Sequence, residues 1–323
     1  MELYLIRHGE TVDNVAGLYA GVRDSALTIH GVEQARRLGE HFTKNEVTLS
    51  HIFASPLSRA LMTAQAIQTA QISSGNDQLN IMQAPHLIEQ DFGYYEGKTF
   101  QARTEAKKSG KESHREKHKD DPGYVDVESK ESLNKRADAF LDEHMMPLFA
   151  VKSERPRTVV AVVSHGILLS HLWRRLLARF DSKTVTVAPE VIAARGSIVL
   201  EHLGGWSNTG YLELVLDSSK PALEMCLAET VAAWTTCADE LPALDREKVD
   251  RTATTIESVP PSADDSEKTI TGSALKGWTM VIRGIDRKEH LTGLKRQRGG
   301  IGRSAHDSSQ KKLDSFFKRQ RTS

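Results

Sequence analysis

Short apolar runs alternate with amphipathic stretches along the first two thirds of the chain. A short apolar run bounded by polar residues is typical of a strand buried inside a sheet. The stretches between these runs carry apolar residues three and four positions apart, which is typical of a helix that packs one face on the sheet. This alternation predicts an α/β fold, a three-layer α/β/α sandwich around a mostly parallel sheet. The runs predict strands at residues 3–6, 51–54, 158–163, 198–203 and 212–216.

The clearest of the predicted helices covers residues 28–44. Its apolar positions include Ile29, Val32 and Leu38, and Thr28 stands where a hydroxyl can cap the first turn. We expect helices of this kind to cover both faces of the sheet. The same spacing predicts further helices at residues 58–71, 132–149 and 167–180.

Three segments depart from this pattern. Residues 102–131 are dense in charge and have almost no apolar residue to bury, which predicts a solvated helix or loop. The sheet pattern stops after Asp217, and residues 249–273 are rich in Ser, Thr, Asp, Glu and Pro, as disordered linkers are. We therefore expect one folded domain at 1–217, a helix at 222–238 and then the linker within 218–273, and a basic, largely disordered tail with a short apolar patch (278–282) at 274–323.

The composition limits the compartment and the partners. Lys and Arg total 43, as do Asp and Glu, so no net charge attracts the chain to a membrane surface or to nucleic acid, and we expect no sequence-specific nucleic-acid binding. The longest apolar run, Val159–Val163, is far too short to cross a bilayer. Two cysteines outside metal-ligand spacing and the absence of a secretory signal indicate a reducing compartment, the cytoplasm, the nucleus or both.

Chemically active residue types follow three of the predicted strands. The first strand runs into Arg7 and His8, the second leads to Arg59 at a helix start, and the third ends at His165 and Gly166. Because ligands of open α/β sheets bind at the carboxyl ends of the strands, we expect these side chains in one pocket. A single Arg-His pair at a strand end could equally make structural hydrogen bonds, but three converging strand ends favour a functional site.

The combined chemistry of these side chains suits a phosphoryl group. Guanidinium groups hold phosphate oxygens bidentately, and neighbouring cations favour the neutral form of an imidazole. A neutral His8 could attack phosphorus. The pattern therefore predicts an anion pocket with a nucleophile inside it.

Four sequence blocks, RHGETVDN, ASPLSRALMTA, LIEQDFGYYEG and VVSHG, resemble the motifs of the histidine phosphatase superfamily, also called phosphoglycerate mutase-like proteins. The resemblance spans residues 1–217. It implies that His8 becomes phosphorylated, and that Glu89 first gives a proton to the leaving group and then takes one from water. It also implies that the phosphoryl group is bound by Arg7, Asn14, Arg59, His165 and Gly166.

The block EQDFGYYEGKT is more similar to the phosphatase branch, which includes fructose-bisphosphatase-like members, than to the ERHYGxLxG form of the mutases. We expect a phosphomonoester hydrolase that acts on a phosphorylated small molecule through a phosphohistidine, with no metal and no other cofactor. A phosphoglycerate mutase-type phosphotransferase is the alternative within the superfamily. His114 and His118 stand four positions apart and could ligate a metal on a helix, but a solvated charged face is the favoured interpretation.

The tail carries a second motif at residues 310–317. Gln310, Leu313, Phe316 and Phe317 match the pattern Q-x-x-[LIM]-x-x-aromatic-aromatic, which resembles the PIP box of proteins that bind the sliding clamp PCNA. A helical turn would gather the three apolar side chains into one plug, and the basic flanks suit nuclear import or a clamp on DNA. Two alternatives stay open: the phenylalanines dock on the catalytic domain, or that domain is catalytically idle and the tail carries the biological role.

Overall fold

The computed structural model describes residues 1–102, 123–150, 158–218, 275–296 and 301–307. Within these residues, seven strands form one sheet in the order β3-β2-β4-β1-β6-β7-β5. Only β6 runs against the others, so the predicted mostly parallel sheet is confirmed. The strands are β1 (Glu2–Arg7), β2 (His51–Ala54), β3 (Ile81–Gln83), β4 (Val159–Ser164), β5 (Val185–Val187), β6 (Tyr211–Asp217) and β7 (Thr279–Arg287).

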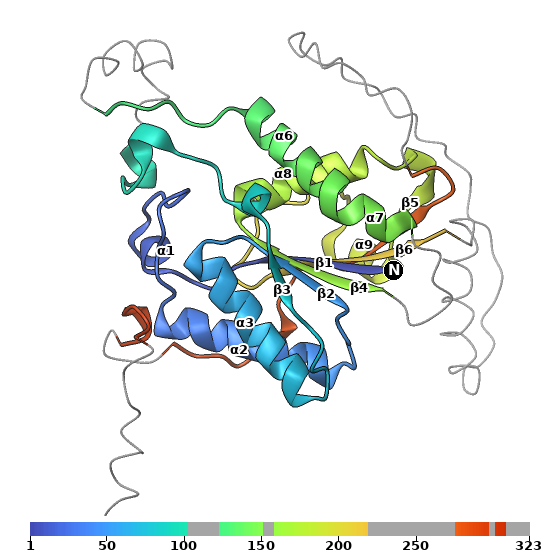
Figure 1. The fold of residues 1–323 in the computed structure, drawn as a ribbon, viewed down its shortest axis with the longest axis horizontal. Coiled ribbons are helices and arrows are strands. Elements are labelled where there is room, and N and C mark those ends of the chain that lie inside the picture. Colours follow the sequence, from blue (N-terminus) through green and yellow to red (C-terminus); the bar gives the residue numbers. More distant parts are fainter. Residues whose placement is uncertain (103–122, 151–157, 219–274, 297–300, 308–323) are drawn as a thin grey trace, which may run out of the picture.

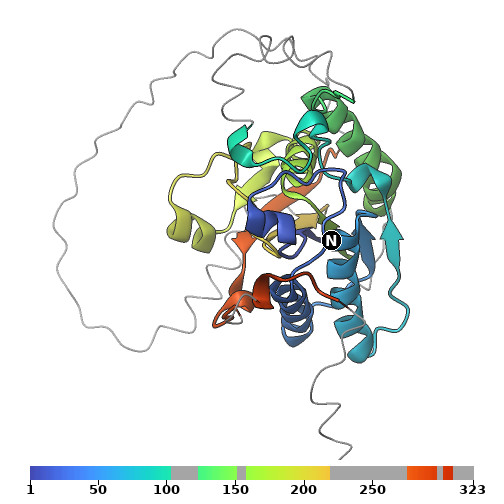
Figure 2. The same ribbon diagram turned by 90° about the vertical axis from the view of Figure 1, so that its left-hand side faces the viewer.

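Helices cover both faces of the sheet, as Figures 1 and 2 show. The helices α2 (Ile29–Lys44) and α3 (Ser58–Ser73) pack on one face, and α6 (Lys130–Phe140) and α8 (Gly166–Leu177) pack on the other. The predicted three-layer α/β/α sandwich is therefore confirmed.

The side chains of β1 alternate between the two cores. Leu3 and Leu5 lie in the core below α6 and α8, whereas Tyr4 and Ile6 lie in the core formed with α2 and α3. A strand with both faces buried is apolar at successive positions. This explains why β1 and β4 are continuous apolar runs in the sequence.

The helices begin close to the predicted positions. Thr28 Oγ1 accepts a hydrogen bond from Gly31 N at 2.9 Å and caps α2 as predicted. The segment predicted as one helix at 132–149 is α6, a π-helical turn (Leu141–Met145) and α7 (Met146–Ala150) in succession. Two further α-helices are short, α1 (Val12–Ala16) and α9 (Pro189–Arg195).

The sheet does not end at Asp217, and this expectation was wrong. The apolar patch at 278–282 belongs to β7, which pairs antiparallel with β6 and parallel with β5. Met280 and Ile282 are fully buried in the same core as β1 and α8. Residues from the region interpreted as a tail therefore form an interior strand of the sheet.

The strand predicted at 198–203 was also wrong. This segment has no strand structure, and β7 occupies the place beside β6. Ile198, Leu200 and Leu203 are partly buried against the core, and Trp173 Nε1 of α8 donates to Leu200 O at 2.6 Å. The apolar residues that suggested a strand cover α8 as an irregular segment.

Several sequence predictions lie outside the described residues. They include most of the charged segment, the helix at 222–238, the linker at 249–273 and the motif at 310–317. Among the described helices, none has the length and hydropathy needed to cross a membrane.

Candidate active site

His8 follows directly after β1 at the carboxyl edge of the parallel strands. Backbone hydrogen bonds fix its position, since His8 N donates to Ser164 O at 3.0 Å and Gly9 N donates to Thr63 Oγ1 of α3. An added Cβ at Gly9 would come within 2.6 Å of Gly31 O, so only glycine allows α2 to pass this close. The strand tip is therefore held between β4, α2 and α3.

The hydrogen bonds of His8 select one tautomer. Nδ1 lies 2.7 Å from Gly9 O, and a carbonyl oxygen can only accept, so Nδ1 carries the proton in the neutral ring. This leaves a lone pair on Nε2. Burial, together with the guanidiniums of Arg59 and Arg7, holds the pKa of His8 well below its usual value of 6.5. His8 is thus neutral at physiological pH, as a nucleophilic imidazole must be.

His165 and Arg59 lie beside His8. The two imidazole rings have centroids 5.0 Å apart, and Arg59 Nε donates to His165 Nδ1 at 3.1 Å. His165 Nε2 then carries the proton of the neutral ring and donates to Ser55 Oγ at 2.9 Å. Burial, and next the charge of Arg59, holds the pKa of His165 well below 6.5. The side chains from three strand ends therefore meet at one place, as predicted.

The Arg59 guanidinium is fully buried, and most of its N–H groups donate to protein atoms. Its terminal nitrogens donate to the carbonyl oxygens of Arg23, Ala20 and Gly21 at 2.9, 3.2 and 2.7 Å. With the bond to His165, four of its five N–H groups have partners within the described residues. Arg59 therefore organises the loop at residues 20–23, and its Nη1 also pairs with Asp24 at 3.8 Å.

The Arg7 guanidinium makes fewer hydrogen bonds within the described residues than the Arg59 guanidinium does. One terminal nitrogen donates to Trp206 O at 2.5 Å, whereas Nε is buried and has no hydrogen-bond partner in the described part of the chain. Burial lowers the pKa of Arg7 from its usual 12.5, but a guanidinium stays charged in proteins. Gly166 lies against it, since an added Cβ there would be 3.9 Å from Arg7 Nε. Buried donors of this kind are usually satisfied by an ordered water or by a bound ion or ligand.

Glu89 lies at the start of α8, next to His165 in space. Its carboxylate accepts hydrogen bonds from Ile167 N at 3.1 Å and Leu168 N at 2.9 Å, and from Gln90 N at 2.9 Å. The group is 7% exposed, and its charge acts on the guanidiniums of both Arg7 and Arg59. The structure therefore brings Glu89 to the same site.

Asn14 joins the site through its side-chain oxygen. Asn14 Oδ1 accepts from Thr11 N at 3.2 Å and from Asn208 Nδ2 at 3.1 Å. Asn208 also donates to His8 O at 3.2 Å. Asn208 was not among the residues predicted from the sequence, although one signal was present: the polar turn SNTG precedes a strand that starts at the edge where β1 ends.

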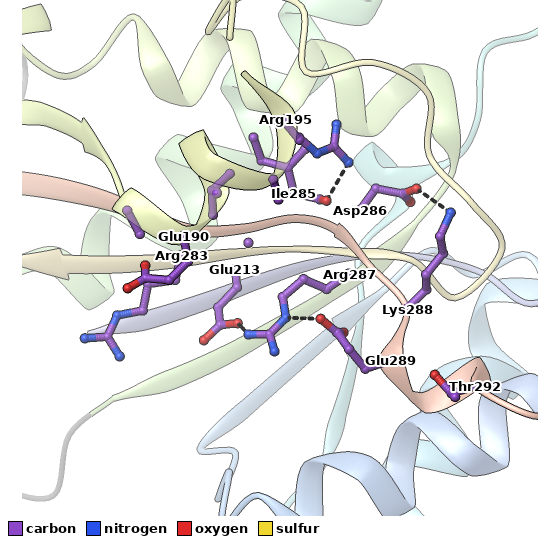
Figure 3. A pocket seen from close by; sticks show the side chains of 14 residues that line it. Glu190, Arg195, Glu213, Arg283, Ile285, Asp286, Arg287, Lys288, Glu289 and Thr292 are labelled. Atoms are coloured by element: carbon purple, nitrogen blue, oxygen red, sulfur yellow. Dashed lines mark hydrogen bonds and ion pairs between the residues drawn. The ribbon is translucent and has the colours of Figure 1, made fainter. Parts of the chain in front are cut away.

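Two other groups of polar side chains lie apart from these residues. An open groove of about 760 Å³ over β6, β7 and α9 is lined by none of the predicted site residues (Figure 3), and within it Arg287 pairs with Glu213 and Glu289. His86, Glu143 and His144 offer ligand atoms within 4.8 Å of one another and could hold a metal. His114 and His118 lie outside the described residues.

A family model described as the histidine phosphatase superfamily (branch 1) matches residues 3–188. The chain belongs to this superfamily. The resemblance carried by the four sequence blocks is thereby confirmed, and the match includes His8, Arg59, Glu89 and His165.

The relatives of this chain include proteins named phosphatases and proteins named phosphoglycerate mutases. A probable phosphatase of Schizosaccharomyces pombe is 32% identical over 215 residues, which are 66% of this chain and 64% of that protein. A probable phosphoglycerate mutase of Erwinia tasmaniensis is 29% identical over 177 residues, 55% of this chain and 75% of that protein. The chain thus spans less than two thirds of the S. pombe protein. Among solved structures, a phosphoglycerate mutase from Bacillus anthracis is 23% identical, with a TM-score of 0.47, and covers 66% of this chain and 87% of that one.

Proposed function

We propose that the chain is a metal-independent phosphomonoester hydrolase that acts through a phosphohistidine on His8. The observation that carries this proposal is the neutral, buried imidazole with a free Nε2 lone pair beside Arg7, Arg59 and His165. The S. pombe relative named a probable phosphatase supports the same class of reaction.

The reaction has two halves, transfer of the phosphoryl group to His8 and hydrolysis of the phosphohistidine, and Glu89 handles the proton in both. His8 Nε2 attacks phosphorus, the bond from phosphorus to the ester oxygen breaks, and protonated Glu89 gives its proton to the leaving alkoxide. Water then attacks the phosphohistidine, Glu89 takes a proton from it, and the bond from nitrogen to phosphorus breaks. The fixed cations stabilise the charge on the transferred group. The buried Nε of Arg7, which has no partner among the described residues, would donate to a phosphate oxygen, with Asn14 and Gly166 as further phosphate contacts.

A panel of phosphorylated small molecules tests the reaction class. The full chain should release inorganic phosphate from some members of the panel in the presence of a chelator, and His8→Ala should release none. A His8→Ala variant with wild-type turnover would overturn the proposal.

A mutase is the alternative within the superfamily, and the relative from Erwinia tasmaniensis keeps it open. Incubation with 3-phosphoglycerate separates the two reactions. Hydrolysis yields inorganic phosphate in proportion to the substrate consumed, whereas a mutase yields the 2-phospho isomer with little phosphate. The second result would replace the hydrolase proposal.

We propose in addition that the segment 310–317 binds PCNA. The support is the sequence motif alone, because these residues lie outside the described part of the chain. Adjacent phenylalanines within an otherwise polar segment suit a protein–protein interaction site. In a binding assay with purified PCNA, the double variant Phe316→Ala, Phe317→Ala should lose affinity, while Asp314→Ala, Ser315→Ala at the variable motif positions should not. Equal behaviour of wild type and the phenylalanine variant would remove this proposal.

A catalytically idle binding module is the remaining alternative. It predicts no turnover across the whole panel and cellular effects that depend only on Phe316 and Phe317. The structure counts against it, because all five proposed catalytic side chains, of Arg7, His8, Arg59, Glu89 and His165, lie at one site.

A further inference from the structure

The loop at residues 206–209, here called the Asn208 loop, connects three of the predicted site residues, Arg7, His8 and Asn14. Trp206 O accepts from Arg7, Asn208 Nδ2 donates to both His8 O and Asn14 Oδ1, and Thr209 N donates to Arg7 O at 3.0 Å and His8 O at 3.2 Å. A single short loop thus holds the backbone and side chains around the nucleophile.

The hydrogen bonds of this loop determine which way the amide of Asn14 faces. Thr11 N can only donate, so the atom of Asn14 that it meets must be the oxygen. Asn208 Nδ2 donates to that same oxygen. With both donors on Oδ1, Asn14 Nδ2 is turned the other way and can donate to an anion.

The loop is anchored from β7, a strand that lies far along the sequence. The Asp286 carboxylate accepts from Ser207 N at 2.7 Å and from Ser207 Oγ at 2.8 Å. It also pairs with Lys288 at 3.5 Å, and this ion pair is drawn in Figure 3. An added Cβ at Gly210 would come within 2.2 Å of Asp286 Oδ1. The backbone here is special as well, since Asp286 and Thr209 have φ of 51° and 55°. The backbone is therefore strained at Thr209 and Asp286, and Asp286 packs tightly against Gly210 behind the site.

On the basis of the proposed function, we infer that Asn208 is a positioning residue for phosphate binding, and that Asp286 holds the Asn208 loop in place. Neither residue needs to touch the substrate. Asn208 sets the orientation of Asn14 and the position of the His8 backbone. The loop carbonyl at Trp206 holds a terminal nitrogen of Arg7, whose Nε has no partner in the part of the chain that the structure describes.

Binding of inorganic phosphate, measured by calorimetry on the full chain, tests this inference. Asn208→Ala removes both donors without adding charge, and Asn208→Asp replaces them with an anion. Displacement of a binding group by about 1 Å can cost about a hundredfold in rate, and we expect phosphate affinity to fall by about 10- to 100-fold in both variants.

Asn76 offers a matched control. Its Nδ2 also donates to a backbone carbonyl, that of Leu49 at 2.8 Å, and to a side-chain amide oxygen, that of Gln71 at 3.3 Å. The variants Asn76→Ala and Asn76→Asp should bind phosphate like wild type. The inference is overturned if Asn208→Ala binds phosphate like wild type, or if the Asn76 variants lose as much affinity.

A variant at Asp286 gives a second test, in which the electrostatic effect and the loss of the loop anchor change phosphate binding in opposite directions. This test also applies if the Asn208 variants do not fold. Asp286→Gly suits the positive φ and removes a negative charge whose field acts on Arg7. Electrostatics alone predicts tighter phosphate binding, whereas loss of the loop anchor predicts binding weakened about tenfold or more. Tighter or unchanged binding would overturn the role of Asp286.

Hydrolysis of para-nitrophenyl phosphate by the same samples separates this inference from the proposed function. A wild type that binds phosphate but releases no product contradicts the hydrolase proposal, and the binding data still decide the role of Asn208. A wild type that turns over normally, with Asn208→Ala equal to it in phosphate affinity, contradicts the inference alone.

Discussion

Three of the residues that would carry the chemistry, His8, Arg59 and His165, were visible in the sequence. His8 and His165 stand just after apolar runs and Arg59 stands at a helix start, and their convergence follows from the parallel sheet. The orientation of these groups was not predictable. One of the contacts that position His8, from Asn208 Nδ2 to His8 O, joins residues 200 positions apart and comes from a turn without any apolar pattern.

At His8, the low pKa gives a spectroscopic prediction. Burial and the two guanidiniums favour the neutral ring, so the imidazole should stay unprotonated as the pH falls through 6.5. An NMR titration of ¹⁵N-labelled histidines, with His8→Gln to assign the signal, measures this directly. A His8 signal that titrates near 6.5 would contradict the proposed nucleophile.

At Glu89, the prediction concerns proton transfer. Glu89→Gln keeps the size of the side chain but removes the acid, and kcat should fall by about 10²- to 10⁴-fold. The loss should be larger for an alkyl phosphate than for para-nitrophenyl phosphate, whose leaving group needs little protonation. Glu96→Gln is the matched control, because Glu96 also accepts from three backbone N–H groups, those of Gly21, Val22 and Phe92. Equal losses in the two variants would indicate a structural role for Glu89.

At the scale of the elements, six of the seven strands lie within residues 1–217, and β7 does not. Apolar runs predicted the long central strands, whereas β3 and β5, each of three residues, are too short to give a pattern. The apolar patch of β7 was visible in the sequence, but its pairing with β6 joins residues on either side of the long segment 218–278. Sequence periodicity contains no information on such a distant partner.

The burial of β7 predicts the outcome of truncation. Met280 and Ile282 are fully buried, and each such side chain contributes about 1.5 to 3 kcal/mol, a large part of a typical stability of about 5 to 15 kcal/mol. Residues 1–217 alone should show no cooperative thermal transition by circular dichroism. Residues 1–307, which lack only the end of the tail, should melt close to the full chain. Coincident melting of all three would contradict the placement of β7 in the core.

At the scale of the whole molecule, buried histidines make the fold sensitive to acid. Burial, followed by Arg174, lowers the pKa of His171 to about 4, and burial, followed by His41, lowers the pKa of His290 to about 4. Below the usual pKa of 6.5 the unfolded chain therefore binds more protons than the folded chain does, and stability should fall from about pH 6.5 down to about pH 4.

Urea unfolding at pH 7.5 and pH 5 measures this dependence. His171 should account for about 2 kcal/mol of the difference in the free energy of unfolding, so His171→Gln should reduce the difference by that amount. The same substitution at exposed His202 is the control. An unchanged difference in His171→Gln would show that this imidazole is not held neutral by the fold.

The central claim is that His8 Nε2 takes the phosphoryl group, and rapid-quench labelling tests it most directly. The full chain is mixed with a ³²P-labelled phosphomonoester that it hydrolyses, quenched in alkali within one turnover, and digested for mass spectrometry. The account predicts acid-labile phosphate on the peptide that contains His8, formed before free phosphate appears and absent from His8→Ala. Full hydrolysis with no phosphorylated His8 at any time within the turnover would contradict it.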